Sequence, residues 1–290
     1  MSIYSTVLHV LFVAISYVIA IHLKAKSGDR NDPSIIQSRL IRVSIASIIF
    51  ILLTKYVLIY LLHTIPNEIA LYQIFGLKNP FTQHCLCQVF NTLKLFMILF
   101  MGPLSELILS FIYSPSCESS YDSFYEVLRD LVIAPLTEEI FYTSLTTGPL
   151  LAYKLYQRGG SSTYEPTVFH NDNSISLILQ LNPLLFGFAH LHHGYEMYHK
   201  GYRLAQIIGL CGFQCLYTTL FGYLTNLIFV NTGNIWCCFI AHSFCNFMGF
   251  PNISVKGNIF HMVFYWFLLI LGVNSFGALF DKLTFIENAS

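Results

Sequence analysis

The chain has 290 residues, of which 55% are hydrophobic and only 10% are charged. A soluble domain is about one quarter charged, so this composition excludes an ordinary water-soluble globular protein. The 15 basic and 15 acidic side chains cancel, which leaves no net positive charge for nucleic acid as a partner. Because apolar segments recur from end to end without a long polar module, we expect a single polytopic membrane domain over residues 1–290.

The apolar segments predict an all-α membrane protein with about eight spanning helices, because a bilayer core takes about 20 residues of helix. Uninterrupted spans are expected at 3–23, 43–63, 86–113, 204–230 and 259–280. Spans that contain polar groups are expected at 127–151, 176–193 and 235–250. These polar groups are the candidates for function, since an ionisable side chain at membrane depth is costly unless it faces a cavity or a partner.

The distribution of lysine and arginine between the connections predicts the orientation of the chain. With eight spans, the two sides receive Lys24, Lys26, Arg30, Arg39, Arg42, Lys200, Arg203 and Lys256 against Lys78, Lys154, Arg158 and Lys282. Cytosolic connections carry the excess of positive residues, so both termini are expected on the side away from the cytosol.

The first polar span carries two adjacent carboxylates, Glu138 and Glu139, shortly after Pro135. Neighbouring positions of a helix point about 100° apart, so the two side chains cannot serve the same face. One of them is expected to reach a cavity and the other a polar partner. Tyr142 lies one turn after Glu138 and is a candidate to line the same site.

The other two polar spans each present candidate residues along one helical face. Phe186 and His190 are four residues apart and share a face, with Phe186 expected mainly to pack. The stripe in the last polar span consists of His242, Cys245, Asn246 and Gly249. Glu138 lies early in a span that runs one way, whereas His190 and Asn246 lie late in spans that run the other way. All three should therefore approach the same leaflet, which the charge distribution makes the cytosolic one.

These three elements resemble the CAAX prenyl endopeptidases, the Ras-converting branch of the CAAX protease and bacteriocin-processing superfamily. That family carries a Glu-Glu-x-x-x-Arg helix, a Phe-x-x-x-His helix and a His-x-x-x-Asn helix, in this order. The chain supplies Glu138-Glu139, then Phe186 to His190, then His242 to Asn246, which places a catalytic core at about 127–251. Thr143 occupies the usual arginine position, so the partner of Glu139 is left undefined.

The resemblance implies a bundle of about eight helices around a cavity open to the cytosolic leaflet. It implies an endopeptidase that removes the aaX tripeptide from prenylated CAAX proteins such as Ras-like small GTPases. The residues in and around the motifs are similar to those of the eukaryotic branch. This implies a multi-pass protein of the endoplasmic reticulum membrane with its site facing the cytosol. No cofactor or metal is implied, and the oligomeric state stays open.

Peptide hydrolysis needs an activated water, a proton donor for the leaving amine and donors for the oxyanion. We expect Glu138, with His190, to activate the water as general base. His242 and Asn246 are expected to donate hydrogen bonds to the oxyanion. Glu139 is expected to orient His190 or Glu138, or to bind the substrate backbone.

Three other interpretations use the same residues. A zinc protease would ligate the metal with Glu138, His190 and His242, although no H-E-x-x-H motif is present. A thiol protease would pair Cys245 with His242, one turn away. A transporter or non-catalytic binding protein would use the carboxylates and histidines as a relay, with polar groups that run towards both leaflets.

Overall fold

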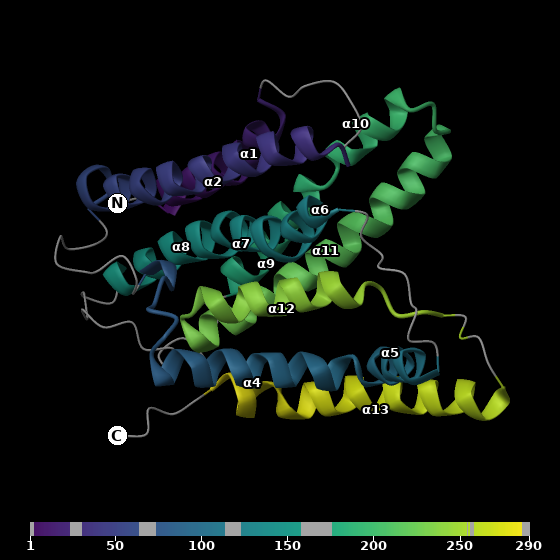
Figure 1. The fold of residues 1–290 in the computed structure, drawn as a ribbon. Coiled ribbons are helices and arrows are strands. Elements are labelled where there is room, and N and C mark those ends of the chain that lie inside the picture. The colour runs from purple at the N-terminus through teal and green to yellow at the C-terminus, as the bar shows by residue number, and fades with distance from the viewer. Residues whose placement is uncertain are drawn as a thin grey trace.

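The computed structural model describes residues 3–23, 31–63, 74–113, 123–157, 176–253, 255 and 258–285. Every regular element within these ranges is a helix (Figure 1), which confirms the all-α prediction. Among the charges used to orient the chain, Lys24, Lys26, Arg30, Arg158 and Lys256 lie outside the described residues.

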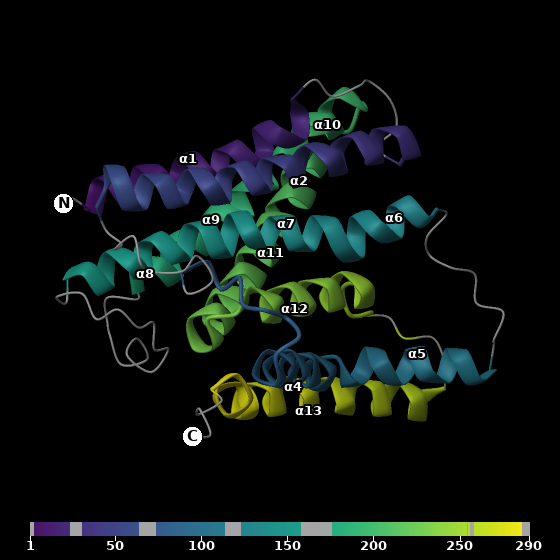
Figure 2. The ribbon, with the colours of Figure 1, turned by 60° about the vertical axis from the view of Figure 1, so that its left-hand side comes forward.

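The first two helices lie side by side and run in opposite directions (Figures 1 and 2). They are α1 (Ile3–His22) and α2 (Pro33–Tyr56), the latter extended by the wide helical turn η1 (Val57–Leu61). The start of α2 lies ten residues before the predicted start of the second span. Asp32 explains this early start, because its side chain accepts a hydrogen bond from the Ser34 amide and a proline follows at the first helical position.

The carboxylate-bearing span forms one long rod (Figure 2). Its segments are α6 (Phe124–Leu128), η2 (Arg129–Ile133), α7 (Ala134–Glu139), η3 (Ile140–Ser144) and α8 (Leu145–Gln157). Both η segments are π-helical turns, and they flank the six residues of α7 that end in the two glutamates. Such wide turns are rare inside helices and are frequent at functional sites.

The span predicted at 86–113 is not one straight helix. The pair α4 (Gln83–Leu99) and α5 (Met101–Tyr113) bends by 84° at the single residue between them. Pro103 has no amide proton for the carbonyl of Leu99, which removes one hydrogen bond at this point. Both helices pack against α13 (Ile259–Thr284), as Figure 1 shows.

The remaining helices are α9 (Ser176–Ala189), α10 (His192–His199), α11 (Leu204–Thr232) and α12 (Ile235–Met248). Four helices of the described chain are long and apolar enough to cross a membrane: α1, α2 with η1, α11 and α13. The bent pair α4 and α5 gives a fifth if it counts as one span. These helices make the chain a multi-pass membrane protein. They include fewer full-length spans than the eight expected, because α9 and α12 have only 14 residues each and two π-helical segments divide the helix that bears the carboxylates.

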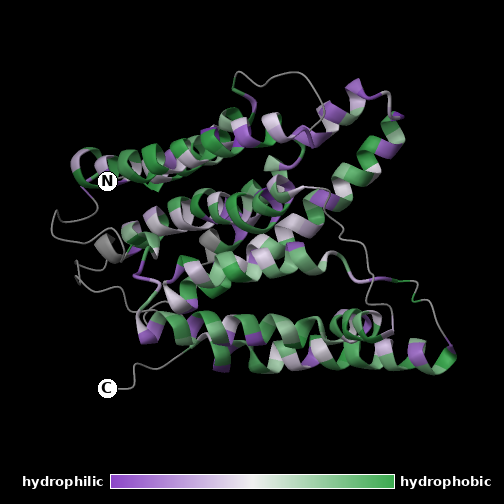
Figure 3. Ribbon diagram, viewed as in Figure 1, coloured by the Kyte–Doolittle hydropathy of each residue, from purple (hydrophilic) through white to green (hydrophobic). Residues whose placement is uncertain are grey.

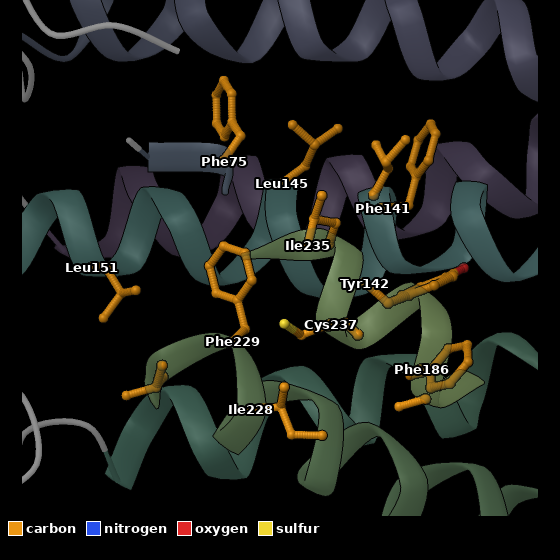
Figure 4. Close-up of a cluster of buried hydrophobic side chains, with 14 of the residues drawn as sticks. Phe75, Phe141, Tyr142, Leu145, Leu151, Phe186, Ile228, Phe229, Ile235 and Cys237 are labelled. Atoms are coloured by element: carbon orange, nitrogen blue, oxygen red, sulfur yellow. The ribbon is translucent and has the colours of Figure 1, made fainter. Parts of the chain in front are cut away.

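Aromatic and aliphatic side chains from the central helices form the core around which the polar residues are arranged. Figure 4 shows Phe141 and Tyr142 from η3, Phe186 from α9 and Phe229 from α11 in this cluster. The ring centroids of Tyr142 and Phe186 are 5.0 Å apart. Hydrophilic residues gather instead in α10, beyond the end of α9 (Figure 3).

Candidate active site

The structure brings the predicted polar residues to one cavity of about 580 Å³. Its lining includes Glu138, Tyr142, Phe186, His190, His242 and Asn246. These residues come from three separate segments of the sequence, and the fold brings them to the same cavity. The cavity also receives residues of α1, α2, α10 and α11.

The two adjacent glutamates face different surroundings, as the helical geometry predicts. The Glu138 side chain is 18% exposed and lines the cavity. Its Oε1 accepts a hydrogen bond from the Tyr17 hydroxyl of α1 at 3.4 Å. The Glu139 side chain is only 2% exposed and lies behind the cavity wall. Glu138 can therefore meet a ligand, whereas Glu139 meets only protein groups.

His242 of α12 lies between the two carboxylates. Its Nδ1 is 2.8 Å from Glu139 Oε1, and its Nε2 is 3.7 Å from Glu138 Oε2. Because a carboxylate only accepts, Nδ1 carries the proton of the shorter contact. The imidazole also packs against the rings of Phe186 and Phe221, at centroid distances of 5.9 Å and 4.7 Å. These contacts fix the ring with Nε2 directed towards Glu138 and the cavity.

The structure shows the hydrogen-bond partners of Glu139, which the sequence left undefined. Its Oε2 accepts a hydrogen bond from Thr143 Oγ1 at 2.7 Å, while Oε1 binds His242. Thr143 in turn lies 3.5 Å from Thr225 Oγ1 of α11. We expected Glu139 to orient His190 or Glu138, or to bind the substrate backbone, but the side chain that it holds is His242.

His190 follows the last residue of α9 and lines the same cavity. Its Nδ1 is 2.9 Å from the carbonyl oxygen of Phe186, and its ring packs against Phe186 at 5.1 Å. A carbonyl oxygen accepts and cannot donate, so Nδ1 bears the proton. In the neutral ring, Nε2 is then free of a proton and able to accept one.

Asn246 lies one turn after His242 at the exposed end of α12. One amide proton of Asn246 is donated to the main-chain oxygen of Asp130, at 2.9 Å. The amide has a second proton, which a ligand in the cavity can accept. Asp130 and Tyr17 are contacts that sequence reasoning missed, because neither residue stands in a motif.

Comparisons with known proteins assign the chain to a family. Residues 120–248 match the family described as type II CAAX prenyl endopeptidase Rce1-like. The chain is 32% identical over 273 residues to CAAX prenyl protease 2 of Saccharomyces cerevisiae, covering 87% of this chain and 82% of the relative. The chain belongs to this family.

Two further relatives extend the comparison. CAAX prenyl protease 2 of Homo sapiens is 30% identical over 259 residues, which cover 84% of this chain and 70% of the relative. The probable CAAX prenyl protease 2 of Schizosaccharomyces pombe is 29% identical over 276 residues, covering 91% and 86%. No solved structure matches the chain.

The donor atoms in this Rce1-like site do not form a metal-binding set. Within the part of the chain that the structure describes, no group of three histidine, cysteine, aspartate or glutamate side chains could hold a metal ion. Cys245 is 5% exposed, and His242, its proposed partner, is held by Glu139. The geometry thus favours neither the zinc nor the thiol interpretation.

Buried uncharged polar groups continue from the site into the bundle. Thr147 donates a hydrogen bond to Asn226 Oδ1, and Asn182 donates to Thr147 at 2.7 Å. Asn226 donates to the carbonyl oxygen of Gly222 at 2.7 Å. These groups bind one another and the main chain, and none of them is ionisable. They join helices α8, α9 and α11 without extending the cluster of carboxylates and histidines.

Proposed function

We propose that this membrane protein is an endopeptidase that removes the C-terminal aaX tripeptide from prenylated CAAX proteins, such as Ras-like small GTPases. The observation that carries this proposal is the meeting of Glu138, His190, His242 and Asn246 at one cavity. The substrate class comes from the relatives, which are named CAAX prenyl protease 2.

Glu138 is the proposed general base, assisted by His190. Its carboxylate is the exposed member of the glutamate pair, and a water in the cavity can reach it within hydrogen-bonding distance. The carboxylate takes a proton from the water as oxygen attacks the peptide carbonyl. The same proton then passes to the leaving amine. His190 supports this step because its Nδ1 proton is held by Phe186 and its Nε2 can accept.

His242 and Asn246 are the proposed oxyanion donors. Glu139 holds Nδ1 of His242, so in the imidazolium form the remaining proton on Nε2 is directed into the site. Asn246 contributes the amide proton that is not donated to Asp130. Removing one such donor typically costs a factor of 10² to 10³ in kcat. Glu139 acts through His242 and is a positioning residue.

We place the catalytic core at about 127–251, within a bundle of about eight spans that includes the shorter helices α9 and α12. The proposed location is the endoplasmic reticulum membrane, with the cavity open to the cytosolic leaflet. The end of α1 and the start of α2 lie beside the cavity, and the connection between them is rich in lysine and arginine. The positive-inside rule supports a cytosolic position for this connection. A prenyl chain partitions into lipid, so a site near the interface can take the peptide from water and the chain from the bilayer.

The test is cleavage of a farnesylated Cys-a-a-X peptide by the purified full chain in lipid nanodiscs with a chelator present. The released tripeptide is measured by mass spectrometry, beside the same peptide without the farnesyl group. We expect prenyl-dependent release by the unmodified protein and none by Glu138→Ala. A folded preparation that releases no tripeptide would refute the proposal, and activity that requires added zinc would refute its metal-free mechanism.

A further inference from the structure

Two arginines line the cavity besides the proposed catalytic residues, and their surroundings differ. The guanidinium of Arg129 forms a bidentate contact with the Asp130 carboxylate, at 2.5 Å and 2.9 Å. The guanidinium of Arg39 is 3.7 Å from Glu196 Oε1, and both of these side chains are 26% exposed. The contact of Arg39 with Glu196 is thus longer than a hydrogen bond, and a carboxylate in the cavity can form a shorter one with the guanidinium.

Arg39 supplies a permanent positive charge to the part of the cavity lining that includes Glu196 and His192 of α10, which we call the rim. Its partner Glu196 belongs to α10, which follows the end of α9. His192, also at this rim, adds no constant positive charge, because burial lowers its pKa. Arginine stays protonated at all relevant pH values, and its planar guanidinium matches both oxygens of a carboxylate.

The separation between the proposed base and this rim along the helix axes can be estimated from the first two helices. Tyr17 of α1 contacts Glu138, and one turn later the carbonyl oxygen of Ile21 accepts a hydrogen bond from Arg42 of α2. Arg39 lies three residues before Arg42 on α2, which runs antiparallel to α1 (Figure 2). At 1.5 Å of rise per residue, these two steps place Arg39 about 10 Å from the level of Glu138.

We propose that Arg39 binds the α-carboxylate at the C-terminus of the substrate and thereby sets the cleavage point three residues from the chain end. An extended tripeptide spans about 10 Å, which matches the separation along the helices. The substrate carboxylate forms a bidentate contact with the guanidinium, in place of the long contact with Glu196. This inference rests on the proposed function, because it concerns the tripeptide that the reaction releases.

The test compares two farnesylated Cys-a-a-X peptides that differ only in ending with a carboxylate or a carboxamide. The unmodified protein is expected to cleave the acid with a kcat/KM about 10- to 100-fold higher, the usual range for a hydrogen-bonded charge pair. In Arg39→Gln, the ratio of acid to amide is expected to fall towards one. Arg39→Lys retains the charge without the bidentate geometry, so an intermediate ratio is expected.

Arg42→Gln is the matched control, because it removes an arginine from the same helix. Arg42 donates to Ile21 and Ser38 and does not line the cavity, so its removal should keep the ratio of the unmodified protein. A ratio near one in the unmodified protein, or an unchanged ratio in a folded Arg39→Gln, would overturn the inference. If the preference for the acid peptide is lost in Arg129→Gln and kept in Arg39→Gln, then Arg129 binds the substrate carboxylate and the inference for Arg39 is wrong. If neither prenylated peptide is cleaved, the proposed function itself has failed.

Discussion

The imidazole of His242 and the carboxylate of Glu139 meet at 2.8 Å although 103 residues separate them in the chain. The contact joins α7 to α12 and leaves the other ring nitrogen directed towards Glu138. Glu139 is itself held by Thr143. The Thr143 hydroxyl and the His242 imidazole thus orient the carboxylate of Glu139. Thr143 stands at the position that an arginine usually occupies in the family motif.

We expect Thr143→Val to lower kcat about 10- to 100-fold, because it leaves one oxygen of a buried carboxylate without its donor. Valine has nearly the shape of threonine, so packing is preserved. Thr143→Ser keeps the hydroxyl and should retain most of the activity. Peptide cleavage is compared between the unmodified protein, Thr143→Val and Thr143→Ser at a temperature below the melting temperature of all three.

Thr225→Val is the control for this series. Thr225 Oγ1 lies 3.5 Å from Thr143 and donates to the carbonyl oxygen of Gly222, so it does not bind Glu139 directly. Its effect on kcat should be smaller than that of Thr143→Val. Equal losses in the two valine variants would contradict a specific role for the Thr143 hydroxyl.

Glu138→Gln should lower kcat by about 10² to 10⁴, the usual contribution of a general base. Glutamine keeps the size of the side chain and can still accept from Tyr17, so the fold should survive. The control is Glu106→Gln on α5, where the carboxylate accepts an exposed hydrogen bond from Asn252 at 3.3 Å and does not line the cavity. Activity of a folded Glu138→Gln within ten-fold of the unmodified protein would exclude this residue as the base.

The meeting of the polar residues could be predicted from the sequence, whereas their pairing could not. Helical periodicity and the direction of each span are enough to bring Glu138, His190 and Asn246 to one depth. Which carboxylate His242 binds depends on the rotation of α12 against α7. The π-turns on both sides of α7 alter that rotation, and no residue pattern marks them.

The positions of the apolar spans could likewise be predicted from the sequence, whereas their number and shape could not. Hydropathy finds apolar segments but reports neither bends nor the length of the helix inside them. The 84° bend before Pro103 divides an apolar stretch that reads as one span. The contact of Tyr17 with Glu138 was likewise not predictable, because a tyrosine in an apolar helix has no distinctive signal.

Cys245→Ala should keep cleavage within a few-fold of the unmodified protein. The thiol is buried, and the nitrogen atoms of its proposed partner His242 face Glu139 and Glu138. The lost packing costs about 1 kcal/mol of stability, which a small fall in melting temperature would report. Complete loss of cleavage in a Cys245→Ala protein that still folds would support the thiol interpretation instead.

Gly187→Ala should destabilise the protein through the contact of α9 with α11. A Cβ atom at Gly187 would lie 2.0 Å from Thr219 Oγ1 and 2.7 Å from the carbonyl oxygen of Cys215. The main-chain carbonyl cannot move aside as a side chain can, so the helices must separate. Overpacking of this kind costs about 1 to 3 kcal/mol in the free energy of unfolding.

Moving α9 away from α11 should also displace residues of the site. Phe186 and His190 lie on either side of Gly187 in the sequence, and both line the cavity. We therefore expect lower cleavage together with a lower melting temperature in Gly187→Ala. Gly212→Ala on α11 is the matched control, because a Cβ there meets no atom within 4 Å. Alanine is favoured over glycine in a helix by about 1 kcal/mol, so Gly212→Ala should keep or raise the melting temperature. Equal melting temperatures for the two variants would show that α9 and α11 do not depend on this close approach.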